Sequence, residues 1–181
     1  VWRLRQRGDA WPPGRTVAWV LGCAALLVAT SSGLGRYAPA MFSVHMGNHM
    51  ILSMLAPVLL ALGGPITLAL RALPVAGRDN PPGPREWVQY AVTSPVARVL
   101  GNPAVAVVMF VGSFYVLYLG GVFDLVAQYH GAHLFMNFHF LLSGYLFYWT
   151  TIGVDHAPYR LKPLGKLSIV WGTVSYTHLR A

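Results

Sequence analysis

Charged residues are scarce in this chain of 181 residues. Asp, Glu, Lys and Arg make up 10% of it, whereas 55% of the residues are hydrophobic and the mean hydropathy is +0.52. A soluble domain usually carries about 25% charged residues, so the composition indicates an integral membrane protein with the lipid bilayer as a partner. The net charge of +8 is spread between apolar segments, which argues against nucleic acid as a partner.

Cysteine is almost missing as well. Cys23 is the only one, so a disulfide within the chain and a CxxC pair are both excluded. This argues against a thiolate-based metal carrier and against a thiol oxidoreductase. The sequence also lacks a glycine-rich phosphate loop, a nucleophile elbow and paired carboxylates for acid–base catalysis. We therefore do not expect an enzyme.

Long apolar runs, in contrast, are plentiful. Four of them reach roughly the length that an α-helix needs to cross a bilayer: they cover about residues 16–32, 42–62, 103–120 and 132–152. A fifth begins near Lys166 and is not completed. The sequence therefore predicts an all-α fold, a polytopic transmembrane helix bundle with four complete spans and a truncated fifth.

Local signals add detail to these helices. Asn102 and Pro103 suit the N-cap and the first position of the third span. Pro57 removes the partner of the Ser53 carbonyl and should kink the second span. The link 64–102 should hold two short helices, one over about 85–92 and one from the Ser-Pro pair at 94–95 to residue 101.

Basic residues gather in three of the connecting segments and predict the orientation of the chain. They are Arg3, Arg5, Arg7 and Arg15 before the first span, Arg71, Arg78, Arg85 and Arg98 between the second and third, and Arg160, Lys162 and Lys166 after the fourth. The positive-inside rule places these segments in the cytoplasm. We therefore expect a multi-pass protein of the bacterial plasma membrane with its N-terminal side cytoplasmic.

Three regions follow from this reading. Residues 1–15 are interpreted as a cytoplasmic lead-in cut from a longer N-terminal region. Residues 16–174 form the transmembrane domain. Residues 175–181 interrupt the last apolar run and are interpreted as a tail foreign to the native protein.

Histidines in the second and fourth spans are the main functional signal. The predicted orientation places His45 and His49 in the outer part of the second span, and His133 and His139 in the outer half of the fourth. His45 and His49 lie about 40° apart on one helical face, whereas His139 lies about 120° from His133. Burial in lipid favours the neutral imidazole, which keeps one nitrogen available for a metal. We predict a metal site formed by these four histidines.

The neighbouring methionines favour copper. Met46, Met50 and Met54 are interleaved with the first histidine pair, and thioethers select Cu(I), whereas imidazole suits copper, zinc and iron. Met46, Met50 and His130 are therefore further candidate ligands. Haem held by facing histidines is one alternative, and an ion or metal permease is another. In the structural alternative the imidazoles only hydrogen-bond between helices.

The acidic residues after the third and fourth spans carry a weaker signal. Asp155 should lie on the cytoplasmic side, where we expect it to pair with a basic loop residue such as Arg160.

Two stretches resemble a known family. "FSVHMGNHMILSMLAPVLLALGGPITLALRALP" (42–74) and "HLFMNFHFLLSGYLFYWTTIGVD" (133–155) are similar to the CtaG-type cytochrome c oxidase assembly proteins, as is "GNPAVAVVMFVGSFYVLYLGGVFD" between them. These are bacterial multi-helix membrane proteins linked to caa3-type oxidases, and the likeness covers about residues 36–171. In actinobacterial versions a copper-resistance-type membrane domain can precede this one.

The resemblance implies a role in maturing the oxidase by copper supply, with oxidase subunits as partners. The family's paired histidines match His45 and His49, and its HFLL-type histidine matches His139. Some relatives carry another histidine or an acid near Asn137, which this chain lacks. A scaffold that chaperones oxidase subunits without a metal is the alternative within the same family.

Overall fold

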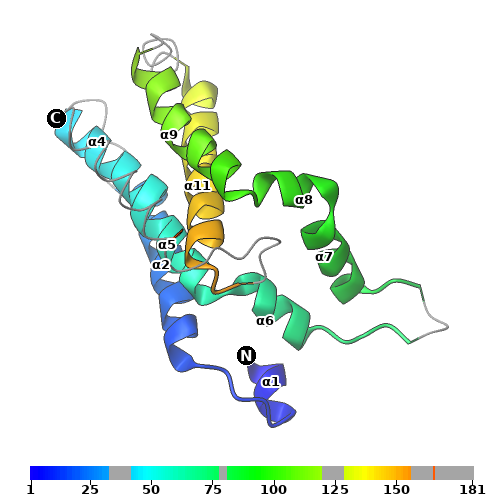
Figure 1. Ribbon diagram of the computed structural model, residues 1–181. Coiled ribbons are helices and arrows are strands. Elements are labelled where there is room, and N and C mark those ends of the chain that lie inside the picture. The colour runs from blue at the N-terminus through cyan, green and yellow to red at the C-terminus, as the bar shows by residue number, and fades with distance from the viewer. Residues whose placement is uncertain (33–41, 78–80, 120–128, 156–164, 166–181) are drawn as a thin grey trace.

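The computed structural model describes residues 1–32, 42–77, 81–119, 129–155 and 165 (Figure 1). All regular structure in these residues is helical, which confirms the all-α prediction. The elements are α1 (Trp2–Gln6), α2 (Pro13–Ser31), α4 (Phe42–Met50), the π-helix η1 (Ile51–Leu55), α5 (Ala56–Gly63), α6 (Pro65–Ala72), α7 (Pro84–Thr93), α8 (Pro95–Leu100), α9 (Pro103–Leu119) and α11 (His130–Ile152).

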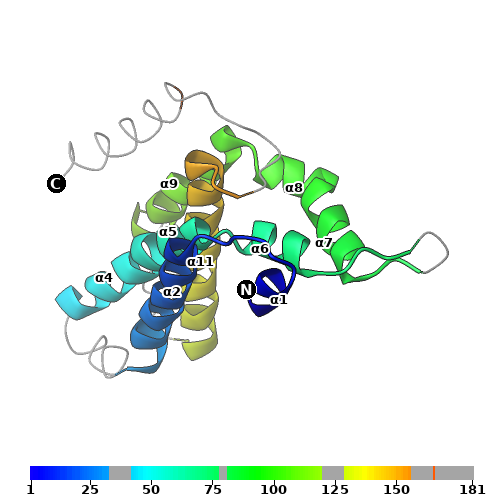
Figure 2. The same ribbon diagram turned by 90° about the horizontal axis from the view of Figure 1, so that it is seen from below.

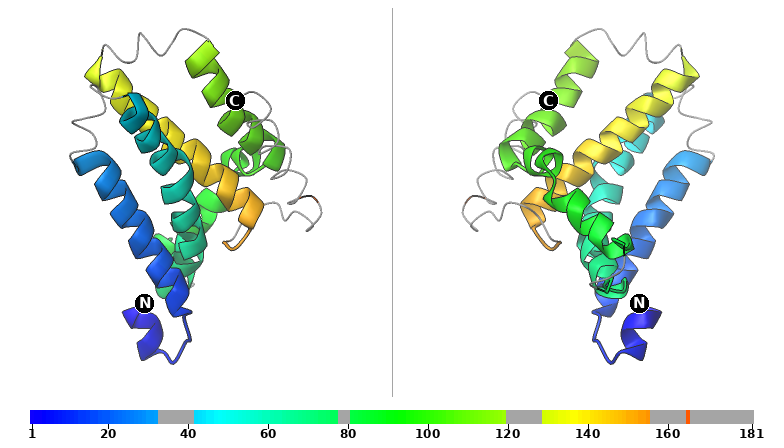
Figure 3. Two further views of the ribbon diagram at one scale, coloured as in Figure 1. Left: turned by 90° about the vertical axis from the view of Figure 1, so that its left-hand side faces the viewer. Right: turned by 90° about the vertical axis from the view of Figure 1, so that its right-hand side faces the viewer.

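A bundle of four helical rods organises the chain. The segments α4, η1 and α5 follow one another as a single rod, with α2 on one side of it and α11 on the other, and α9 packs against α11 (Figures 1 and 3). Small residues allow α2 and α5 to approach closely. A Cβ added at Gly22 would lie 2.9 Å from Leu60, and one added at Gly63 would lie 3.0 Å from Trp19.

The central rod contains the irregularity that Pro57 predicts. Because proline has no N–H, the Ser53 carbonyl cannot accept the usual hydrogen bond from four residues later. The helix widens into a π-helical turn over Ile51–Leu55, and the Ala56 N–H bonds to the carbonyl of Ile51, five residues back. Such π-turns inside α-helices are rare and are often found at functional sites.

The central rod and α11 run in the same direction, as the orientation argument predicts. Three contacts occur in the same order along α11 and along the segment made of the central rod and α6. His45 lies near His133 at one end, Ser53 meets Gly144 in the middle, and Thr67 bonds to Asp155 at the other end. In Figure 1 the histidine end is uppermost, and α1, α6 and α7 lie toward the opposite end.

The two helices predicted in the 64–102 link are confirmed as α7 and α8. Glu86 reaches back to the Gly83 N–H at the start of α7, and the Ser94 hydroxyl caps α8. The predicted cap of α9 is also present, because Asn102 Oδ1 accepts a hydrogen bond from the Ala104 N–H. Figure 2 shows α6, α7 and α8 extending to one side of the bundle.

Two short helices were not expected from the sequence. One is α1. The other is α6, which begins immediately after Gly64, where the backbone enters the left-handed region with φ +62°.

The four-span prediction is confirmed only in its helical content. Two stretches among the described residues are long and apolar enough to cross a membrane, Pro13–Ser31 and Ser43–Ala72, and Pro103–Leu117 forms a shorter apolar helix. The crossing of a membrane by these helices, and by α11, therefore stays a prediction. The truncated fifth span and the tail at 175–181 lie outside the described residues.

Candidate metal centre

Three of the predicted ligands meet at one end of the bundle. His45 and His49 lie one turn apart on α4, and His133 lies in the first turn of α11. One nitrogen from each ring lies within 4.8 Å of the corresponding nitrogens of the other two. The parallel arrangement of the central rod and α11 brings these segments together, although they are more than 80 residues apart in sequence.

The rings face one another closely. His49 Nε2 lies 2.9 Å from His45 Nε2. One of these nitrogens is therefore protonated and donates a hydrogen bond to the other. The His133 ring centroid lies 5.5 Å from that of His45 and 5.8 Å from that of His49. A metal bound by two imidazole nitrogens at about 2.0 Å would hold them about 3.3–3.5 Å apart. Small rotations of the three rings would therefore be enough to produce that geometry.

The centre is closed on its inner side. His49 is only 2% exposed, and its ring packs 5.4 Å from that of Phe140, which is fully buried. Phe140 in turn packs with Leu117, Met136 and Phe114. This apolar floor favours neutral imidazole, the form that binds metals. His45 and His133 are half-buried and leave the opposite side more open.

Asn137 provides a partner for His133 one turn later on the same helix. Its amide nitrogen is placed 3.4 Å from His133 Nδ1, while its buried Oδ1 has no partner in the described part of the chain. The two amide orientations are nearly indistinguishable by shape. Turning the amide over lets Oδ1 accept from Nδ1–H. That pairing would leave Nε2 of His133 unprotonated and available as a metal ligand, a common arrangement for histidine ligands.

His139 is not brought into this group. Its Nε2 lies 2.6 Å from the Ser113 hydroxyl on α9, and that hydroxyl also bonds to the Met109 carbonyl. Because the serine's one proton goes to that carbonyl, His139 donates to Ser113 and ties α11 to α9. The helical angle of about 120° between His133 and His139 explains the separation. The side chain of His130, a further candidate ligand, lies outside the described residues.

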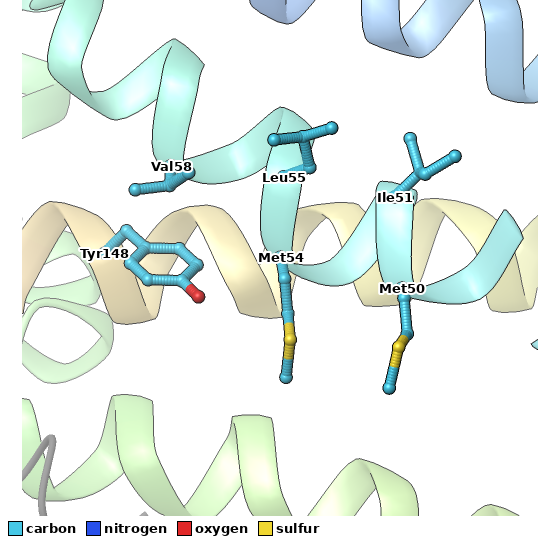
Figure 4. A pocket seen from close by; sticks show the side chains of 6 residues that line it. All are labelled: Met50, Ile51, Met54, Leu55, Val58 and Tyr148. Atoms are coloured by element: carbon cyan, nitrogen blue, oxygen red, sulfur yellow. The ribbon is translucent and has the colours of Figure 1, made fainter. Parts of the chain in front are cut away.

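The methionines lie on a neighbouring face. Met50, Met54 and Tyr148 line an apolar groove of about 340 Å³ together with Ile51, Leu55 and Val58. Figure 4 shows the two thioether side chains extending in parallel toward the same side of the helix. Met46, the other proposed sulfur ligand, is half-buried and does not line this groove.

Asp155 has a structural role that was not predicted from the sequence. Its carboxylate accepts hydrogen bonds from the backbone N–H of Ile66 at 2.9 Å, from that of Thr67 at 2.6 Å, and from the Thr67 hydroxyl. It therefore caps the N-terminus of α6 and fixes the end of α11 to the central rod. The expected partner Arg160 lies outside the described residues.

Comparison with known proteins gives the family. The family model described as "Cytochrome c oxidase caa3 assembly factor (Caa3_CtaG)" matches residues 1–178. The chain belongs to this family. The match confirms the resemblance read from the sequence and extends it beyond residues 36–171.

Mycobacterial relatives are similar along nearly the whole chain. "Uncharacterized protein Mb0105" of Mycobacterium bovis and "Uncharacterized protein MT0111" of Mycobacterium tuberculosis are each 50% identical over 173 residues, and "Uncharacterized protein ML1998" of Mycobacterium leprae is 49% identical over 174. Each match covers 96% of this chain and 26% of the relative. The chain thus spans about a quarter of the length of these relatives. No solved structure matches it.

Proposed function

We propose that this chain is a membrane-embedded, metal-handling part of a caa3-type cytochrome c oxidase assembly factor. It binds Cu(I) transiently, as cargo, through His45, His49 and His133, and presents it to an oxidase subunit. The observation that carries the proposal is the convergence of three imidazoles from two helices, with ligand nitrogens within 4.8 Å of one another.

The outer surface of the bundle supports the membrane location. Large apolar side chains are exposed on α2, α9 and α11, among them Val20, Leu27, Val108, Phe135 and Phe138, each between 58% and 70% exposed. Lipid accommodates exposed apolar side chains of this size, whereas large apolar patches are rare on water-soluble monomers. With the basic segments in the cytoplasm, the histidine end faces outward at the bacterial plasma membrane.

The geometry favours a small ion over haem. A porphyrin must lie flat between its two axial ligands, and here three rings are packed within 4.4–5.8 Å of one another, centroid to centroid. The third ring occupies the space that a porphyrin plane would need. A Soret band in protein purified from haem-replete cells would support the haem alternative and contradict this argument.

Copper fits the donor set and its surroundings. Three imidazoles suit copper and zinc alike. The thioethers of Met50 and Met54 line a groove on the same helical rod as two of the histidines, and soft sulfur ligands select Cu(I) over zinc. We therefore assign these methionines to the path by which Cu(I) reaches or leaves the histidines.

The test measures Cu(I) retention in competition with a colorimetric Cu(I) chelator. The detergent-solubilised chain is compared with His49→Ala and with His45→Ala/His133→Ala. His139→Ala is the matched control, because it removes a half-buried imidazole from α11 outside the group. We expect the first two variants to lose Cu(I) and the control to keep it.

Two results would count against the proposal. Equal retention in all variants would exclude these ligands. Normal oxidase assembly in cells that carry the triple histidine variant would favour the scaffold alternative. Circular dichroism of each variant verifies that the helices remain formed.

A further inference from the structure

A second pocket lies between α6 and α7, toward the end of the bundle opposite to the histidines. It has a volume of about 330 Å³, and polar side chains of Thr67, Arg71, Arg85, Gln89 and Thr93 line it together with two aliphatic ones. This volume is in the range of small-molecule sites. Neither the histidine centre nor the proposed copper path uses these residues.

The lining has the chemistry of an anion site. Two guanidinium groups, from Arg71 and Arg85, border the pocket, and no carboxylate is among its described lining residues. The Arg85 Nε is buried and has no hydrogen-bond partner in the part of the chain that the structure describes. A buried donor without a partner is costly, and guanidinium groups bind phosphate in a fork-like geometry.

Three acids lie near the pocket, and one of them, Glu86, also interacts electrostatically with Arg85. Glu86 accepts hydrogen bonds from the backbone N–H groups of Ala76 and Gly83, and Asp155 caps α6. Asp9 lies 3.8 Å from Arg71, in a pair that is more than 40% exposed on both sides. An exposed ion pair of this kind contributes little to stability, so we expect it to neutralise the positive charge of Arg71 only weakly.

The surface beside the pocket points to a lipid as the source of the anion. Trp87 and Tyr90 on α7 are 63% and 69% exposed, and Val96 and Val99 on α8 are 66% and 60% exposed. Tryptophan and tyrosine are typical of the headgroup layer. An acyl chain could lie along the exposed valines while the headgroup enters the basic pocket, and basic pockets on the cytoplasmic side of membrane proteins bind anionic headgroups.

We propose that this pocket binds the phosphate of an anionic phospholipid, with Arg85 as the principal ligand and Arg71 beside it. The side-chain amide of Gln89 borders the same space and can donate a further hydrogen bond. The inference rests on the membrane location given under the proposed function, but not on copper binding. An anionic lipid held here would fix α6 and α7 at the cytoplasmic surface.

The test uses the detergent-solubilised chain and short-chain lipids. Binding of dihexanoyl phosphatidylglycerol is compared with that of dihexanoyl phosphatidylcholine and of inorganic phosphate. Arg85→Gln removes the buried donor, and Arg98→Gln, an exposed arginine on α8, removes the same charge outside the pocket. We expect a preference for phosphatidylglycerol, a loss of about tenfold in Arg85→Gln, and unchanged binding in Arg98→Gln.

Three results would overturn the inference. Equal binding of the two lipids would exclude anion recognition. Equal losses in both variants would show general surface attraction. Inorganic phosphate that binds as tightly as phosphatidylglycerol would show a site for free phosphate rather than for lipid. Cu(I) retention measured on the same samples separates the two proposals, because loss of copper binding with intact lipid selectivity would contradict only the first.

Discussion

Gly144 on α11 makes a close contact with the central rod, midway between the histidines and Asp155. A Cβ added there would lie 2.2 Å from the Ser53 carbonyl oxygen and 3.0 Å from Pro57 Cγ. An ordinary C···O contact is about 3.3–3.6 Å, so Gly144→Ala must move the helices apart by roughly 1 Å. Overpacking of this kind costs about 1–3 kcal/mol.

The displacement should be larger at the metal centre. Gly144 lies midway between Asp155, which fixes the lower end of α11, and His133, each 11 residues away or about 16 Å at 1.5 Å per residue. If α11 pivots at Asp155, a shift of about 1 Å at Gly144 becomes about 2 Å at His133. Metal ligands must lie within about 0.2 Å of their proper distance. Gly144→Ala should therefore lose most of its Cu(I) affinity.

The assay is Cu(I) retention against the chelator, with thermal unfolding followed on the same samples. Gly131→Ala is the matched control, because a Cβ built on that α11 glycine meets no atom within 4 Å, and alanine favours the helix by up to about 1 kcal/mol. The control should bind Cu(I) normally. If Gly144→Ala binds Cu(I) as tightly as the parent chain, the proposed coupling between the helix contact and the site is refuted.

Two further predictions concern the end of the bundle opposite to the histidines. Asp155→Ala leaves donors of α6 without acceptors, at about 1–3 kcal/mol for each one that stays buried. The thermal midpoint should fall and α6 should become sensitive to protease, whereas an unchanged midpoint would show that the cap is dispensable. Backbone N–H groups, first that of Ala76, lower the pKa of Glu86 below its ordinary 4.5. The hydrogen bonds by which the Glu86 carboxylate holds the link to α7 should be fully formed above pH 4.5. They should weaken as the pH falls through the lowered pKa. Amide exchange at Gly83 should therefore differ between the parent chain and Glu86→Gln at pH 6, and the difference should shrink as the pH falls below 4.5. Identical exchange at pH 6 would contradict this hydrogen bond.

Much of the architecture could be predicted because the signals are local. Asn102-Pro103 and Ser94-Pro95 place helix starts through side-chain caps and a fixed proline φ, and both starts are present. Pro57 predicts an irregular turn for the same kind of reason. Long apolar runs predict helices, but whether a helix spans a membrane depends on its surroundings, so all four predicted spans stay predictions.

The site was harder to predict because it depends on which helical faces meet. The i,i+4 spacing predicts that His45 and His49 share a helical face. The predicted orientation of the spans places His133 at the same depth in the membrane as this pair. His139 has the same residue type and nearly the same depth, yet the helical angle turns it to Ser113. The closeness of α11 to the central rod depends on Gly144, and nothing in the sequence marks that glycine as a contact. The expected pairing of Asp155 with Arg160 lies outside the described residues and stays a prediction, whereas its hydrogen bonds to the backbone N–H groups of α6 were not predicted.

X-ray absorption at the copper K-edge, recorded on the Cu(I)-loaded chain, tests the central claim most directly. We expect a first shell with about three nitrogen scatterers near 2.0 Å and the outer-shell pattern of imidazole. That pattern should be lost in His45→Ala/His133→Ala and preserved in His139→Ala. A first shell made only of sulfur, or an imidazole pattern that survives in His45→Ala/His133→Ala, would contradict a copper centre built from His45, His49 and His133.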